Sequence, residues 1–250
     1  MVNYICNLRR DSEDDYERDY KFSLLQKADI PIPKSADLRQ GYMAIKDQKN
    51  LGACTGFSVA SVMEYLAKES GEVDLDDLDL SELYIYYKER QLDGTITQDY
   101  GSSIRQSAKV ATKIGACREK LAPYIVENFA LAPTAEAEAD AENHKIKAYY
   151  RLNTIDDILY CVGVMKKPVL IGVDVYDSFM RIGRDGYIKM PDVNRERLIG
   201  GHALNICGFF WLDRSIQKSI WQRFLDFIFR RKAANYGTGL IMKSGTRAAQ

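Results

Sequence analysis

Three residues of this chain have the types and the order that acyl chemistry at a thiol requires. Cys54 is a candidate nucleophile, His202 a candidate base, and Gln48 a candidate donor to a developing oxyanion. A thiol attacks an acyl carbon only as the thiolate, so it needs a neighbouring base that holds its proton and later delivers it to the leaving group. The sequence therefore proposes a reaction as well as a fold.

The residues after the cysteine predict an element that favours the thiolate. Apolar residues from Phe57 to Leu66 recur at helical spacing, which indicates a long amphipathic helix beginning at Cys54. The amino end of a helix carries partial positive charge. We therefore expect a lowered pKa for this thiol.

Of the two histidines, only one has surroundings that suit a base. His202 follows two glycines and precedes an apolar run, which predicts an imidazole at the start of a strand. His144 follows the alanine-rich and acidic run 133–143, for which we expect a short solvated helix or a linker. We expect an exposed helical position for that histidine.

The rest of the chain separates into helices first and strands second. Helices are predicted at Ser81–Lys88 and Ser102–Lys113, and strands at Pro168–Val175 and Ala203–Phe209. This order predicts an α+β protein with a helical lobe and a sheet lobe. The nucleophile and the base must then meet where the two lobes join.

Composition excludes several other classes of protein. The 250 residues are 46% hydrophobic, and the 35 basic side chains balance 35 acidic ones, so nothing marks a nucleic-acid binder. Five scattered cysteines without C-x-x-C spacing indicate neither a disulfide framework nor a zinc site. We expect no metal, because two isolated histidines offer no ligand cluster, and no cofactor.

The two ends of the chain carry their own expectations. Residues 1–35 are polar, include Pro31 and Pro33, and predict an extended arm or short pro-segment before a domain at 36–250. No signal peptide or transmembrane run is evident, so we expect a cytoplasmic protein or one secreted without a classical signal peptide. Residues 212–232 predict an amphipathic packed helix, with contact to a membrane or partner as the alternative.

Two segments resemble motifs of the papain-like cysteine peptidases. Gln48–Ser58 (QKNLGACTGFS) is similar to the family pattern Gln-Gly-x-Cys-Gly-Ser-Cys-Trp-Ala-Phe-Ser. Gly200–Phe209 (GGHALNICGF) is similar to Gly-Gly-His-Ala-Val-x-Ile-x-Gly-Tyr. The cysteine and histidine are about 150 residues apart, as in this family. The resemblance covers residues 36–209 and extends to bacterial members of the xylellain-like type. Shorter similar segments are Ala36–Arg39, Leu80–Tyr84, Asp99–Ser102 and Ala122–Tyr124.

The resemblance implies a papain-like two-lobe fold with a cleft between the lobes. The helical lobe, about 36–130, would carry Cys54 as nucleophile, and the sheet lobe, about 145–250, would carry His202 as general acid and base. The side-chain amide of Gln48 and the backbone N–H of the cysteine would stabilise the oxyanion. Substrate-binding positions would be Gly101, where a missing Cβ lets an extended peptide approach, and Gly201.

The chain also departs from the family pattern. Thr55 replaces the tryptophan after the nucleophile, and Leu51 stands where many relatives have a disulfide cysteine. The Asn-Ser-Trp-Gly segment, whose asparagine orients the histidine, is missing, with Asn235 and Ser244 as alternative candidates for the third catalytic member. Loss of that member costs triads orders of magnitude in rate.

These observations predict a monomeric cysteine endopeptidase that acts on peptide or protein substrates through a thiolate–imidazolium pair and an acyl-thioester intermediate. We expect it to bind cysteine-peptidase inhibitors, and we expect the arm to lie at the cleft, so that deletion of residues 1–35 raises turnover. Two alternatives remain. One is a weakly active or silent papain-like module that binds peptides or a partner. The other is a peptidase for ubiquitin-like tails, or an acyl transferase, that uses the same Cys/His pair.

Overall fold

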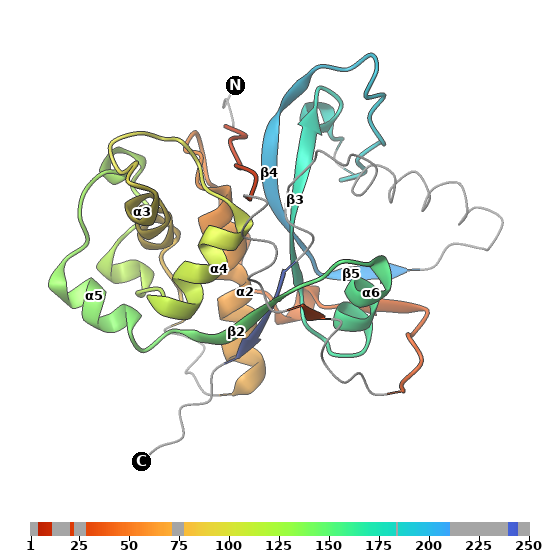
Figure 1. The fold of residues 1–250 in the computed structure, drawn as a ribbon, viewed down its shortest axis with the longest axis horizontal. Coiled ribbons are helices and arrows are strands. Elements are labelled where there is room, and N and C mark those ends of the chain that lie inside the picture. The colour runs from red at the N-terminus through yellow and green to blue at the C-terminus, as the bar shows by residue number, and fades with distance from the viewer. Residues whose placement is uncertain are drawn as a thin grey trace.

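A computed structural model describes residues 5–11, 21–22, 29–71, 78–183, 185–210 and 240–244, the last range by its backbone. The helix predicted at 212–232 and the candidate Asn235 lie outside these residues. Most helices gather on one side of the molecule and the long strands on the other (Figure 1). In the part of the chain that is described, no helix is long and apolar enough to cross a membrane.

The helices begin and end where the sequence supplies caps. Ser81, Ser103, Thr134 and Thr154 each accept a hydrogen bond from a backbone N–H in the first turn that follows, which satisfies one of the free donors there. The three helices predicted before residue 120 are confirmed, the second running on to Asp93. The α-helices are α2 (Cys54–Ser70), α3 (Glu82–Asp93), α4 (Ile104–Lys113), α5 (Ala135–Ala141) and α6 (Ile155–Gly163).

The strands form two antiparallel sheets, with four strands in the order β2-β6-β3-β4 and two in the order β1-β5. The expected start of the histidine strand is wrong, because the ladder with β3 continues through the two glycines to Leu198. His202 therefore lies inside a strand. The strands are β1 (Ser35–Asp37), β2 (Ile146–Arg151), β3 (Val169–Tyr176), β4 (Leu198–Ile206), β5 (Gly208–Phe210) and β6 (Leu240–Ser244).

One apolar core joins the helices to the larger sheet. It includes the inward face of α2, with Val59 and Leu66, the α4 residue Ile104, and the β3 residues Val169 and Leu170. All of these side chains are buried. The nucleophile helix is thus packed directly against the sheet that carries the histidine, which fixes the two catalytic candidates relative to each other.

The alanine-rich run forms a packed helix instead of a solvated one. Ala137 and Ala141 of α5 are fully buried, and small side chains allow this close approach. The side chain of His144 is only 19% exposed, follows the helix and lies 3.8 Å from the Asp140 carboxylate. The expectation of an exposed helical histidine is therefore wrong, because the turn after α5 folds back onto the helical side.

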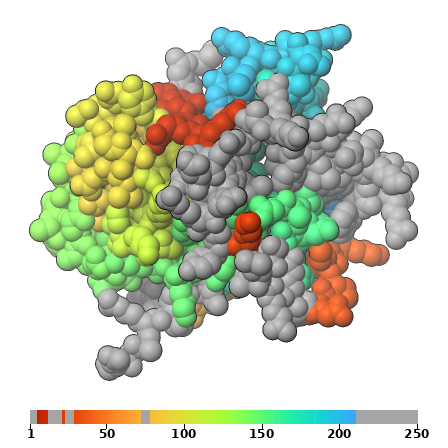
Figure 2. Space-filling view, in the orientation of Figure 1, coloured from red at the N-terminus to blue at the C-terminus, as the bar shows by residue number. Residues whose placement is uncertain are grey.

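The arm enters the molecule between the two sides. Its residues 5–11 run beside β4 (Figure 1), where Leu8 bonds to Gly201 and Arg9 to Ser102 before α4. The space-filling view shows them, in red, between the yellow helical side and the blue hairpin strand (Figure 2). Leu8 and Phe22 belong to the core. Asp11 forms a buried ion pair with Arg151 of β2 at 3.3 Å, each side chain 1% exposed. The arm is therefore anchored as part of the fold.

Candidate active site

The three catalytic candidates line one pocket. Cys54 is the first residue of α2, Gln48 lies on the loop before it, and His202 belongs to β4. All three contribute to the walls of a cavity of about 680 Å³. The fold has brought together groups that are far apart in the sequence, at the junction of the helical and sheet sides.

His202 reaches the pocket from β4, where it pairs with Val173 of β3. Its ring packs edge to face with Phe179, with centroids 6.0 Å apart and planes at 71°. Burial lowers the pKa of His202 from its usual value, which favours the neutral imidazole that a base requires. Its Nδ1 atom is buried and has no hydrogen-bond partner among the described residues.

The thiol of Cys54 is harder to ionise than its place at a helix start predicts. It is 1% exposed, and burial raises its pKa to about 12, with smaller contributions in the same direction from Glu89 and Cys6. Backbone groups of Ala203 and Thr55 act in the opposite direction. The expected lowering of this pKa is wrong here, because loss of water around the thiol outweighs the positive end of the helix.

Gln48 is held by its backbone and presents its side-chain amide at the pocket. Its carbonyl accepts a hydrogen bond from the Tyr124 hydroxyl at 2.8 Å, and that ring packs edge to face with Phe57, with centroids 4.8 Å apart. The side-chain amide donates to the Leu51 carbonyl at 3.1 Å and lies 3.4 Å from the carbonyl oxygen of Ile5. A peptide oxygen from the arm therefore lies beside the proposed oxyanion donor.

Hydrogen bonds from α3 and the loop after it join the loop before Cys54 to the glycine segment of the cleft. The Asp99 carboxylate accepts the backbone N–H of Gly52 at 3.0 and 3.1 Å and also the hydroxyl of Tyr86. The same hydroxyl accepts the N–H of Gly101 at 3.0 Å. Two segments that would contact substrate from different sides are thus tied to one tyrosine.

The arm makes main-chain contacts at both predicted substrate-binding glycines. The N–H of Leu8 donates to the carbonyl of Gly201 at 3.0 Å. At Gly101 φ is +67°, and an added Cβ would lie 2.0 Å from the carbonyl oxygen of Asn7. A side chain at that position would therefore both strain the backbone and expel the arm.

A third catalytic member is not found among the described residues. Ile241 pairs with Val169 of β3, and β6 then runs away from Val173, the partner of His202. This register separates Ser244 from His202 by seven residues along the strands, which is about 20 Å. The backbone therefore places Ser244 at the wrong end of the sheet to orient the imidazole.

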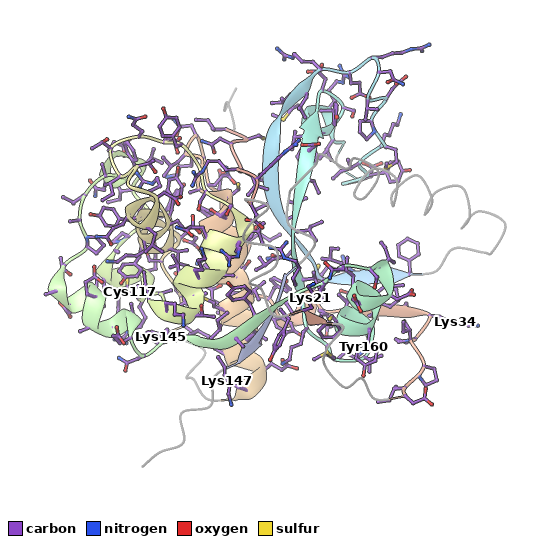
Figure 3. The ribbon with its side chains drawn as sticks, in the orientation of Figure 1. Lys21, Lys34, Cys117, Lys145, Lys147 and Tyr160 are labelled. Atoms are coloured by element: carbon purple, nitrogen blue, oxygen red, sulfur yellow. The ribbon has the colours of Figure 1, made fainter. Side chains whose placement is uncertain are left out.

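The other thiols differ from Cys54 in their surroundings. None of the five cysteines forms a disulfide bond. Cys117 lies on the helical side, away from the strand that carries the histidine (Figure 3), packed near Ala137 and Ala141. Burial raises the pKa of Cys117 to about 12 as well, which makes it a matched reference thiol. Within the described ranges no group of three or more His, Cys, Asp or Glu side chains could hold a metal ion.

Sequence reasoning missed the groups that support the site. Tyr86 and Glu89 lie three residues apart on α3, a spacing that puts both on one helix face, and both are fully buried. The sequence signal that could have identified them is the placement of polar side chains on the helix face that the apolar spacing predicts to be buried. The docking of residues 5–9 left no periodic pattern, because an extended segment in a groove is held mainly by its backbone.

Comparison with known proteins gives the family. The model of the papain family cysteine proteases matches residues 32–221, so the chain belongs to that family. A protein of Acanthamoeba polyphaga mimivirus, described as the uncharacterized peptidase C1-like protein L477, is 33% identical over 186 residues, which are 70% of this chain and 59% of the relative. The chain thus spans less than two thirds of that relative's length.

Solved structures show the same α+β papain fold. Xylellain, a cysteine protease from Xylella fastidiosa, matches with a TM-score of 0.74 and 20% identity over 98% of this chain and 97% of its own. A digestive procathepsin L2 from Tenebrio molitor matches with a TM-score of 0.68 and 16% identity over 96% of this chain and 78% of its own. Bromelain from Ananas comosus, solved in complex with the inhibitor E64, matches with a TM-score of 0.55 and 20% identity. The match covers 73% of this chain and 78% of the bromelain chain.

Proposed function

We propose that this protein is a cysteine endopeptidase that uses Cys54 and His202 and is latent while its arm lies in the pocket. One observation carries the proposal. A nucleophile, a base and an amide donor line a single cavity, and a peptide carbonyl, that of Ile5, already lies beside the donor, Gln48. Membership of the papain family supports the reaction class.

The residues of the pocket would carry out acyl transfer in two stages. His202 takes the thiol proton, and the thiolate of Cys54 adds to the peptide carbonyl carbon while an electron pair moves to the oxygen. The Gln48 amide and the backbone N–H of the cysteine stabilise that oxyanion. The amine leaves with the proton from the imidazole, and water, deprotonated by the same imidazole, then hydrolyses the thioester and restores the thiol.

The walls of the pocket favour an apolar peptide. Its side chains include Phe57, Phe179 and Leu204, and such walls stabilise bulky hydrophobic side chains by removing them from water. Substrates with a large apolar residue beside the cleaved bond should therefore be preferred. The main-chain contacts that the arm makes at the two glycines are those an extended peptide would replace.

Hydrolysis of a peptide library by matched variants tests the proposal. Cys54→Ala and His202→Ala should each abolish cleavage. Cys117→Ala and His144→Ala change the same residue types outside the pocket and should leave it intact. Cleavage that survives Cys54→Ala in purified protein would contradict the assignment.

A silent binding module is the second candidate. It is favoured by the buried Nδ1 of His202, which lacks a partner among the described residues, and by the register of Ser244. Such a module would bind the same apolar extended peptides without cleaving them. Measurable peptide affinity that is equal in the wild type and Cys54→Ala, with no turnover in either, would support it.

A further inference from the structure

Behind the nucleophile lies a buried carboxyl group that the reaction outlined above does not use. Glu89 of α3 is 0% exposed and faces the first turn of α2. The hydroxyl of Thr55, the residue directly after Cys54, donates to Oε2 of Glu89 at 2.6 Å. Thr55 is itself fully buried. The position where the family pattern has tryptophan is thus used here for a side-chain bond between the two helices.

No cation forms an ion pair with this carboxyl group among the described residues, and the charge of Arg90 favours its ionised form only by a smaller effect than burial opposes it. The neighbouring guanidinium of Arg90 bonds to the carbonyls of Ile96 and Phe129 and stacks on the Tyr86 ring at 4.3 Å. An isolated buried carboxylate is costly, so such a group keeps its proton. Burial raises the pKa of Glu89 to about 8 and so favours its protonated form.

The surroundings of Glu89 connect it to the cleft on a second side. The Ser102 hydroxyl also acts on the carboxyl group and lowers its pKa, as Thr55 does. Ser102 follows the cleft glycine, and its carbonyl accepts the arm N–H of Arg9 at 2.7 Å. Oε1 of Glu89 is buried without a hydrogen-bond partner in the described part of the chain. The carboxyl group therefore stands between the nucleophile helix and the rim where peptide binds.

The charge of Glu89 acts directly on the nucleophile. A negative charge there raises the pKa of Cys54, since it opposes a second negative charge nearby. The other charged groups that act on Glu89 are Asp93, which favours the proton, and Arg90, which opposes it; both lie on α3. From α2, the Cys54 thiol interacts electrostatically with Glu89.

We propose that Glu89 is a positioning residue of this peptidase, which holds the first turn of α2 through Thr55 and keeps a proton so that no negative charge stands behind the Cys54 thiolate. This inference rests on the proposed function. It predicts that the reactivity of Cys54 rises less steeply with pH once Glu89 ionises, and that removing this ionisation restores the steeper rise.

Alkylation of the full-length chain by iodoacetamide, followed across pH with each cysteine resolved by peptide mass spectrometry, measures the effect. Glu89→Gln keeps the shape and removes the charge. We expect the ratio of its Cys54 rate to that of the wild type to be close to 1 at about pH 6 and at least about threefold at about pH 9.5, because half a pKa unit changes the thiolate population by that factor. Opening of the arm contributes equally to the Cys54 rates of Glu89→Gln and of the wild type, so it cancels in their ratio. Cys117 serves as the reference thiol in each protein.

Two further variants keep the test decisive. Glu142→Gln removes an equal charge from an exposed position and should leave the ratio at 1 throughout. Thr55→Val removes the donor that lowers the pKa of Glu89, so the pH at which the rise of the Cys54 rate becomes shallower should move higher, whereas Thr55→Ser should leave it unchanged. The comparison of Thr55→Val with Thr55→Ser tests the role of Glu89 even if Glu89→Gln fails to fold.

The outcomes separate the two proposals. A Cys54 rate that depends on His202 but is the same in Glu89→Gln and the wild type at every pH overturns the role of Glu89 and leaves the peptidase intact. A Cys54 rate that never exceeds that of Cys117 and ignores His202→Ala instead removes the proposed function. A pH-dependent ratio for Glu89→Gln that Glu142→Gln does not show supports the role of Glu89.

Discussion

The carbonyl oxygen of Ile5 lies 3.4 Å from the side-chain amide nitrogen of Gln48. Because this amide is the proposed oxyanion donor, the arm offers a peptide group to the site it covers. The arm is held there at Gly201 by its backbone and farther along by the buried Asp11–Arg151 pair. The proposed latency therefore rests on residues 5–8, whereas the Asp11–Arg151 pair anchors the same segment to the fold.

Removing the covering residues alone should activate the enzyme. Deletion of residues 1–7 takes away Ile5, Cys6 and Asn7 and keeps Leu8 and Asp11. We expect peptide turnover to rise at least about tenfold, because an open population of one in ten lowers the apparent rate by that factor. Steady-state kinetics measures it, with Lys34→Ala as an arm variant outside the pocket.

The longer deletion of residues 1–35 is a poorer test. It also removes Leu8, Asp11 and Phe22, which are buried, so the product would lose core contacts together with the cover. Turnover that is unchanged in a well-folded 1–7 deletion would contradict the covering role.

Loss of the oxyanion donor should lower the rate without changing the fold. Gln48→Ala is expected to reduce kcat by about 100-fold or more, with a smaller change in KM, because the donor acts mainly on charge that develops in the transition state. Asn50→Ala, on the same loop, is the control. Equal kcat values for the two variants would exclude Gln48 as donor.

The buried anchor of the arm should matter for stability. Asp11→Asn leaves the Arg151 guanidinium, 1% exposed, without this carboxylate. We expect the free energy of unfolding to fall by about 3 kcal/mol in urea titrations, as for other buried pairs that lose one member. Asp37→Asn, in the exposed pair with Arg39, should have no measurable effect, and equal stability of the two variants would contradict the anchoring role.

Stability should fall as pH rises through the range set by buried acids. Burial raises the pKa of Glu119 from 4.5 to about 7, so between these values the folded protein binds more protons than the unfolded chain. The free energy of unfolding therefore decreases with rising pH in this window. Glu119→Gln should match the wild type near pH 4 and be more stable near pH 7 by thermal unfolding. A difference that does not depend on pH, or one shared by the exposed Glu127→Gln, would refute it.

The starts of α2, α3 and α4 could be predicted because they leave local signals, whereas α6 (Ile155–Gly163) was not predicted. The pairing of Cys54 with His202 was predicted from the resemblance to a family. Apolar spacing after Cys54 gave α2, and Ser81 gave the start of α3. The strand start at Leu198 was missed because pairing with β3 carries the ladder through two glycines that locally indicate a turn.

The ionisation of the site could not be predicted from local pattern. A helix start predicts an acidic thiol at Cys54, whereas its pKa is raised by burial under the arm and the sheet. The role of Thr55 was equally hidden, because its partner Glu89 is on another helix. Such effects depend on tertiary contacts, which no single segment encodes.

The most direct test of the account is the rate at which an epoxysuccinyl cysteine-peptidase probe labels the protein, followed by intact mass. We predict a single label on Cys54, faster in the 1–7 deletion than in the full chain and lost in Cys54→Ala and His202→Ala. Absence of labelling in well-folded protein of both lengths, or labelling that persists in His202→Ala, would contradict a latent Cys54–His202 peptidase.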